Sequence, residues 1–96
     1  MELIGRKLLD DFANNHADSR DRLKRWSGIT DEADWKNIMD IREVFRDVDY
    51  VPNKNRYVFN VEGNNYRVIT QIMFVAQTVR VTNVFTHAEY NRWNKT

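Results

Sequence analysis

A histidine near the C-terminus is the residue of this chain best suited to proton transfer. His87 lies in the stretch VTNVFTHAEYNRW (81–93), where strand-like alternation changes to helical spacing. Thr86 and Glu89 match a capping box, in which the two residues satisfy each other's backbone amides at a helix start. The box accounts for Thr86 and Glu89 but not for His87. Since histidine commonly changes charge near physiological pH, His87 is either an inert surface residue or a proton-transfer group.

Three arginines are expected on one face of a sheet that ends at this histidine. Apolar and polar residues alternate through residues 56–61, 65–74 and 79–85, which predicts a meander of three antiparallel strands. Turn signals at Gly63–Asn64 and Ala76–Gln77 connect them. The outer face of this sheet should carry Arg56, Asn60, Arg67, Gln71, Arg80, Thr82 and Thr86, with Val58, Ile69 and Val84 among them.

The two turns also predict which residues pair across the strands, because a hairpin's turn determines its register. The expected pairs are Val61 with Tyr66, Asn60 with Arg67, Phe59 with Val68, Phe74 with Val79, Ile72 with Val81, and Val68 with Phe85. The core face should then collect Tyr57, Phe59, Val61, Tyr66, Val68, Ile72, Phe74, Val79, Val81 and Phe85.

The outer face has two interpretations. A solvated face is the usual result of such alternation in an antiparallel sheet. A basic face with the nearby Tyr90 also suits an RNA strand, through phosphate contacts and base stacking. The distribution of charge along the chain favours neither interpretation strongly. The first 50 residues hold nine Lys/Arg and twelve Asp/Glu, and the remainder hold six and two.

Helices are predicted in the first half of the chain, after a short strand at Leu3–Ile4. A first helix is indicated by the helical spacing of Leu8, Leu9, Phe12 and Ala13. A second should run from about residue 18 towards residue 33, either continuous or divided at Ser27–Gly28. A third should follow Asn37, with Ile41, Val44 and Phe45 directed inward.

These elements predict an α+β fold of two layers, formed by one domain over residues 1–96. An antiparallel β-meander and a short N-terminal strand would be covered on one face by the N-terminal helices, and a short helical segment would end the chain. With 42% hydrophobic residues, no long apolar segment and no cysteine, we expect a cytoplasmic protein that is not in the membrane. The two histidines lack metal-ligand spacing, so neither a metal site nor a cofactor is expected.

Two motifs resemble a known family. RYVFNVEGNNYRVI (56–69) followed by FTHAEYNRW (85–93) is similar to the HigB branch of the RelE/ParE-like toxins of type II toxin–antitoxin systems. The N-terminal part resembles that family as well, so the likeness covers nearly the whole chain. One departure is Asn91, where the family often has aspartate. The resemblance implies a RelE-like fold.

The resemblance also implies a function. Such toxins are ribosome-dependent mRNA endoribonucleases that cut mRNA in the ribosomal A site by attack of the ribose 2′-hydroxyl, without a metal ion. The partner would be a HigA-like antitoxin with a helix-turn-helix domain. His87 is the candidate for proton transfer, Arg67 for the phosphate, and Tyr90 for stacking or orientation. Lys54, Arg56 and Arg80 are candidate contacts to the RNA backbone.

Two alternatives remain open from the sequence. A non-catalytic protein of the same fold could act on a protein target, as the ParE-like toxins do, or the chain could be a plain RNA-binding module. His87 and Tyr90 after the last strand, together with Arg67, favour the nuclease.

Overall fold

The computed structural model describes residues 1–63 and 65–96 of the chain. The elements in chain order are β1 (Glu2–Ile4), α1 (Arg6–Asn15), a 3₁₀ turn (Ala17–Ser19), α2 (Arg20–Glu32), α3 (Ile38–Arg42), β2 (Asp49–Val51), β3 (Arg56–Val61), β4 (Tyr66–Met73), β5 (Thr78–Thr86) and α4 (His87–Asn94). The predicted α+β class, with a short N-terminal strand and a C-terminal helix, is confirmed.

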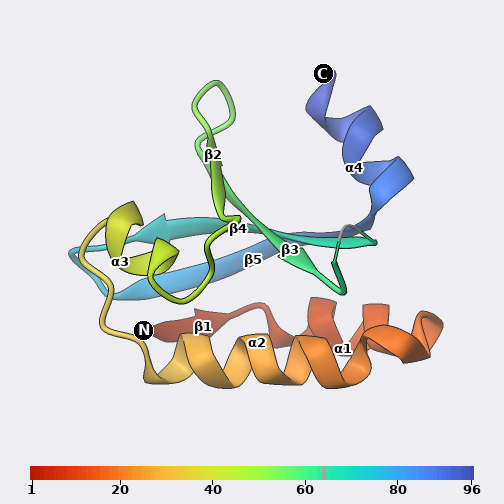
Figure 1. The fold of residues 1–96 in the computed structure, drawn as a ribbon, viewed down its shortest axis with the longest axis horizontal. Coiled ribbons are helices and arrows are strands. Elements are labelled where there is room, and N and C mark those ends of the chain that lie inside the picture. Colours follow the sequence, from red (N-terminus) through yellow and green to blue (C-terminus); the bar gives the residue numbers. More distant parts are fainter. Residues whose placement is uncertain (64) are drawn as a thin grey trace.

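A five-stranded sheet of order β1-β5-β4-β3-β2 forms one layer. Strands β2 to β5 are antiparallel to their neighbours, whereas β1 pairs in parallel with β5. Helices α1 and α2 lie along one face of the sheet, while the β2–β3 turn and α4 project from the other side (Figure 1). Gly5 turns the chain from β1 into α1 with a φ of 94°, and a Cβ there would lie 2.7 Å from the Val81 carbonyl oxygen.

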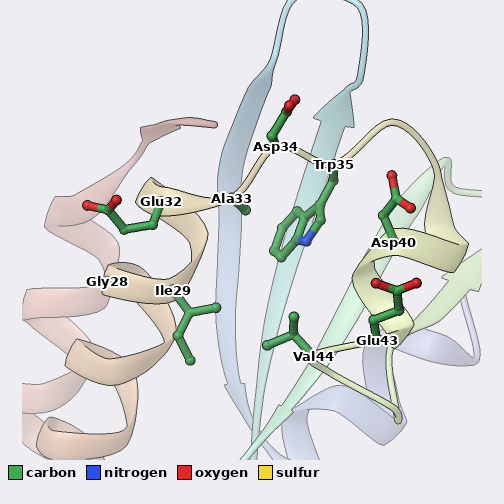
Figure 2. A pocket seen from close by; sticks show the side chains of 9 residues that line it. All are labelled: Gly28, Ile29, Glu32, Ala33, Asp34, Trp35, Asp40, Glu43 and Val44. Atoms are coloured by element: carbon green, nitrogen blue, oxygen red, sulfur yellow. The ribbon is translucent and has the colours of Figure 1, made fainter.

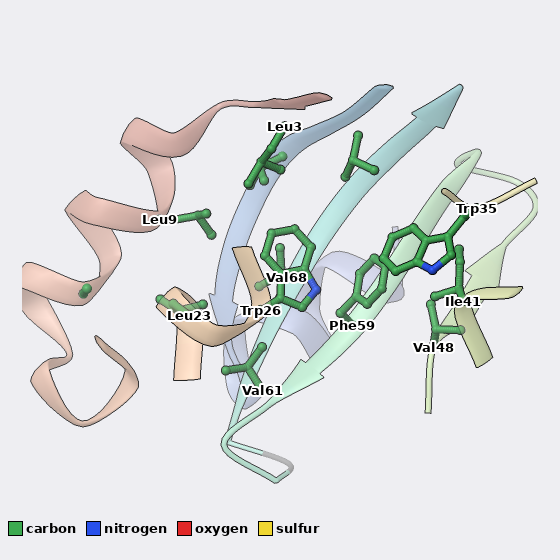
Figure 3. Packing of buried hydrophobic residues seen from close by; sticks show 13 residues of the cluster. Leu3, Leu9, Leu23, Trp26, Trp35, Ile41, Val48, Phe59, Val61 and Val68 are labelled. Atoms are coloured by element: carbon green, nitrogen blue, oxygen red, sulfur yellow. The ribbon is translucent and has the colours of Figure 1, made fainter. Parts of the chain in front are cut away.

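The hydrophobic core fills the space between the helices and the sheet (Figure 3). Trp26 of α2 packs edge-on against Phe59 of β3, with 5.3 Å between ring centroids. Helix α2 continues through Ser27 and Gly28, so the alternative of two short helices is wrong. A glycine inside a helix costs about 1 kcal/mol, and the burial of the Leu23 and Trp26 side chains of the same helix offsets this cost.

The third helix is shorter than its apolar residues suggested. Helix α3 begins after the Asn37 cap, whose side chain accepts a hydrogen bond from the Asp40 amide, and ends at Arg42. Ile41 is buried as predicted, but Val44 is 50% exposed. The inward placement of Val44 is wrong because the helical period stops two residues before it.

The first predicted hairpin is confirmed, whereas the second has a different register. Val61 pairs with Tyr66, Asn60 with Arg67, and Phe59 with Val68; Asn64 of the predicted turn lies outside the described residues. In the second hairpin the three expected pairs are wrong, because Ile72 pairs with Val79, Val68 pairs with Val84, and Phe74 lies in the turn.

Two local features produce this difference. The turn after β4 spans residues 74–77, two more than predicted, and Gln77 adopts a positive φ of 53° there. Thr82 is then an extra residue of β5, between the pairs Thr70–Val81 and Ile69–Asn83. Beyond this bulge the faces of β5 are exchanged. Phe85, predicted for the core, lies on the outer face opposite Arg67, whereas Val84 packs against the core.

Strand β2 was not predicted. It contains only three residues, all of which pair with β3, and in the central pair the ring centroids of Tyr50 and Tyr57 are 4.7 Å apart. No helix in the described part of the chain is long and apolar enough to cross a membrane.

Candidate active site

The end of the sheet brings Arg67 and the start of α4 together. Arg67 of β4 pairs with Phe85, the second-last residue of β5, so its side chain points away from α1 and α2. Helix α4 begins at His87, directly after β5. The backbone amide of His87 donates to the Asn65 carbonyl oxygen at 2.9 Å, which fixes the first turn of α4 to the beginning of β4.

The predicted capping box at this junction is confirmed. The Glu89 amide donates to Thr86 Oγ1 at 3.2 Å, and the Thr86 amide donates to Glu89 Oε1 at 2.8 Å. The hydrogen bond from the Thr86 amide lowers the pKa of Glu89, and partial burial of the carboxylate opposes this effect. Because its pKa is lower in the folded state, Glu89 stabilises the fold fully above its ordinary pKa, and the contribution is lost as pH falls through the folded value.

We expect Thr86→Ala to lower the free energy of unfolding by about 1 kcal/mol, because the Glu89 amide at the helix start loses its acceptor. Urea unfolding at neutral pH measures the change. Asn91→Ala, at an exposed position of the same helix, is the matched control and should stay within about 0.5 kcal/mol of the original protein. Equal stability of the two variants would mean that the cap contributes little.

Arg67, His87 and Tyr90 lie in contact on the outer face. Arg67 Nη2 lies 3.3 Å from His87 Nδ1, and the Arg67 guanidinium carbon is 5.1 Å from the centroid of the Tyr90 ring. Arg67 Nη1 also donates to the Tyr66 carbonyl oxygen at 3.2 Å. Arg67 is only 7% exposed, whereas His87 is exposed. The cluster therefore has a held guanidinium beside a solvent-accessible imidazole.

These contacts bear on the hydrogen-bonding roles of His87 and Tyr90. A guanidinium only donates hydrogen bonds, so His87 Nδ1 accepts in this contact. Burial raises the pKa of Tyr90, the charge of Asp49 raises it further, and Arg67 opposes both. The Tyr90 phenol therefore keeps its proton at neutral pH and is available as a hydrogen-bond donor.

The other predicted cations lie at different distances from this cluster. Lys54, in the β2–β3 turn, reaches α4, where its Nζ lies 5.0 Å from the centroid of the Trp93 ring and donates to Thr96 Oγ1 at 3.1 Å. Arg56 Nη1 donates to the carbonyl oxygens of Lys54 and Asn55, each at 3.0 Å, and so stabilises the turn that presents Lys54.

Arg80 is not brought to the cluster. It is exposed and pairs with Gln71, four residues along β4 from Arg67, which corresponds to about 13 Å. Nor is the outer face uniformly solvated, because Val58 and Ile69 pair across β3 and β4 there and are almost completely buried. Thr86 and Val84, which were predicted for this face, lie on the opposite one as a result of the bulge.

The sequence interpretation missed three residues around the cluster. Asp49 lies in the unpredicted strand β2, and its charge adds to the effect of burial in raising the pKa of Tyr90. Phe85 and Trp93 lie on the same side, with their ring centroids 6.0 Å apart. Trp93 follows Tyr90 by three residues on α4, and this helical spacing was the signal that could have identified it.

A separate groove of about 610 Å³ lies between α2 and α3 and includes none of the predicted site residues (Figure 2). Apolar side chains such as Ile29 and Val44 line it, together with the carboxylates Glu32, Asp34, Asp40 and Glu43. Four carboxylates repel phosphate groups, so this groove does not suit RNA.

Comparison with known proteins identifies the family. The profile of the HigB toxin family, described as the RelE-like toxic component of a toxin–antitoxin system, matches residues 19–93. The mRNA interferase toxin HigB of Escherichia coli strain K12 is 30% identical over 92 residues, covering 95% of this chain and 88% of that protein. The mRNA interferase HigB of Escherichia coli O6:H1 is 29% identical over 93 residues, covering 96% and 90%. The chain belongs to the HigB family of RelE-like toxins, as the sequence motifs indicated.

Proposed function

We propose that this protein is the toxin of a type II toxin–antitoxin system and acts as a ribosome-dependent mRNA endoribonuclease in the cytoplasm. The observation that carries the proposal is the contact of Arg67 with both His87 and Tyr90 on the outer face. The similar Escherichia coli proteins are named mRNA interferases, which agrees with RNA as the substrate.

The proposed reaction requires only side chains and water. The ribose 2′-oxygen attacks the adjacent phosphorus, the bond from phosphorus to the 5′-oxygen breaks, and the products carry a 2′,3′-cyclic phosphate and a 5′-hydroxyl. The 2′-hydroxyl loses a proton and the 5′-oxygen gains one. The exposed imidazole of His87 serves one of these transfers, after the phosphate has taken the Arg67 guanidinium from Nδ1, and water serves the other. The Arg67 guanidinium stabilises the charge that develops on the phosphate oxygens.

Tyr90 has a supporting role in this reaction. Its ring lies against the Arg67 guanidinium. This contact restricts the orientation of the guanidinium plane toward the phosphate. The protonated phenol adds a hydrogen-bond donor beside it. Lys54, Arg56 and Arg80 contact the backbone of the mRNA or of ribosomal RNA, because their charges lie along the same side of the sheet.

The proposed partners are mRNA in the ribosomal A site and a HigA-like antitoxin with a helix-turn-helix domain. The antitoxin neutralises the toxin by covering the basic outer face or by blocking its entry to the ribosome. Acidic or apolar antitoxin residues would suit the face that carries Arg67 and Arg80.

We expect induction of this protein alone in bacteria to stop growth and translation, and co-expression of the antitoxin from the neighbouring gene to restore both. Growth and incorporation of labelled amino acid are measured together with soluble toxin. His87→Gln, induced to the same level, is the control and should permit growth. Normal growth with the original soluble protein would refute the toxin function, and DNA damage without a fall in translation would indicate a ParE-like action instead.

A further inference from the structure

An aromatic surface continues from the Arg67–His87–Tyr90 cluster along α4. Trp93 is partly exposed, and its ring centroid lies 6.0 Å from that of Tyr90 and 6.0 Å from that of Phe85. The other two tryptophans, Trp26 and Trp35, are 2% and 4% exposed and belong to the core. Trp93 is thus a tryptophan supported on two sides by rings but not enclosed, and the proposed reaction does not use it.

A lysine lies over this tryptophan. Lys54 Nζ is 5.0 Å from the Trp93 centroid and donates to Thr96 Oγ1, and Thr96 Oγ1 in turn donates to the Trp93 carbonyl oxygen at 2.7 Å. These contacts connect the β2–β3 turn with α4, the two parts that project from the outer side of the sheet (Figure 1). They are made by a long, partly exposed side chain and an exposed hydroxyl, so an anion from solution can reach Lys54.

The turn that carries Lys54 is held in place independently of α4. Arg56 donates to two carbonyl oxygens of the turn, and Tyr50 Oη donates to Asn55 Oδ1 at 3.0 Å. Asn55 itself has a positive φ of 54°, a conformation that asparagine tolerates well. The Lys54 side chain can therefore leave Trp93 while its backbone stays where it is.

Two neighbouring rings lie between two cations on this surface: Arg67 is against Tyr90, Tyr90 is next to Trp93, and Lys54 lies over Trp93. Single-stranded RNA carries phosphates beside flat bases and so offers a partner to both kinds of side chain. Aromatic side chains bind unpaired bases by stacking. We infer that the Trp93 ring is a binding site for one unpaired nucleobase of the RNA, adjacent to the phosphate that Arg67 holds. Lys54 covers this site in the free protein and moves to a backbone phosphate when the base stacks. This inference rests on the proposed function for the identity of the ligand as RNA.

The test uses a 2′-O-methyl RNA hexamer, which cannot be cleaved, and no ribosome. Because Trp26 and Trp35 are buried, Trp93 is the tryptophan that a bound base can reach, so the hexamer should quench the intrinsic fluorescence. A hexamer of the same backbone without bases should bind about tenfold or more weakly and leave the fluorescence unchanged. Trp93→Phe should abolish the quenching and keep most of the affinity, whereas Trp93→Leu should lose about tenfold in affinity for the normal hexamer only.

A second variant tests the role of Lys54, which covers the Trp93 ring. Lys54→Met should weaken binding of both hexamers through the lost phosphate contact, while base-dependent quenching of Trp93 persists. The inference is overturned by quenching that persists in Trp93→Phe, by equal binding of the two hexamers, or by no binding of the normal hexamer.

These results are separate from those that test the proposed function. A protein that binds the hexamer through Trp93 but cuts no mRNA on ribosomes contradicts the endoribonuclease and leaves the base site intact. Conversely, mRNA cleavage without base-dependent binding contradicts the base site alone.

Discussion

His87→Gln is expected to slow mRNA cleavage on programmed ribosomes by about a hundredfold or more, the usual scale for loss of a positioned acid or base. Glutamine can accept a hydrogen bond from Arg67 in place of Nδ1 but cannot transfer a proton at neutral pH. Single-turnover cleavage at saturating toxin measures the chemical step apart from binding.

Stability distinguishes this effect from a structural one. The capping box is made by Thr86 and Glu89, so His87→Gln should unfold at the same urea concentration as the original protein. Thr86→Ala is the opposite control, with lower stability and nearly normal cleavage at saturating concentration. Near-normal cleavage by His87→Gln would mean that His87 transfers no proton and that Arg67 and Tyr90 carry the reaction.

Arg67→Met is expected to reduce the rate of cleavage by about a hundredfold to a thousandfold, because the phosphate loses the guanidinium that stabilises its developing charge. Arg67 is nearly buried, and methionine fills a similar volume without a charge, so the variant should remain folded. Cleavage is measured at saturating toxin, with thermal unfolding as the check on the fold.

Arg80→Met is the matched control for Arg67→Met. It removes the same charge from the same side of the sheet, but about 13 Å from the cluster. This variant should bind ribosomes more weakly, with a smaller dependence on salt, and should cleave at the normal rate once saturated. Equal loss of the maximal rate in both variants would mean that Arg67 acts only through general charge.

The part of the sheet that could be predicted is the part controlled by local signals. The register of β3 and β4 follows from Gly63 and the alternation on either side, and the structure confirms all three predicted pairs. The second turn lacked such a signal. Its length depends on Gln77, whose side chain donates to the carbonyl oxygens of Trp35 and Phe74 at 2.7 and 2.9 Å. Trp35 is far away in sequence, so a local pattern could not reveal this contact.

The bulge at Thr82 had consequences for the predicted faces. One extra residue in β5 exchanges its sides, which moves Phe85 from the core to the outer face, where it meets Trp93. The alternation of residues 79–85 contains no glycine that would mark such a position. Strand β2 escaped prediction for a simpler reason, since three residues are too few to show a period.

The candidate site was predictable where it depended on order along the chain. Arg67 was expected near the end of β5, and His87 and Tyr90 follow that end directly. The longer turn and the bulge together shifted the partner of Arg67 by one residue, which did not separate Arg67 from them. Asp49 and the contact of Lys54 with Trp93 depend on how β2 and the β2–β3 turn approach α4. That approach depends on how the whole sheet packs, so it could not be predicted from any single segment of the sequence.

The most direct test of the proposed catalytic site is analysis of the RNA ends formed in a single turnover on programmed ribosomes. The original protein should produce fragments with a 2′,3′-cyclic phosphate and a 5′-hydroxyl, and the yield should fall together in His87→Gln and Arg67→Met while Arg80→Met at saturation stays normal. Fragments with a 5′-phosphate, or equal yields from the original protein and His87→Gln, would contradict a site built from Arg67, His87 and Tyr90.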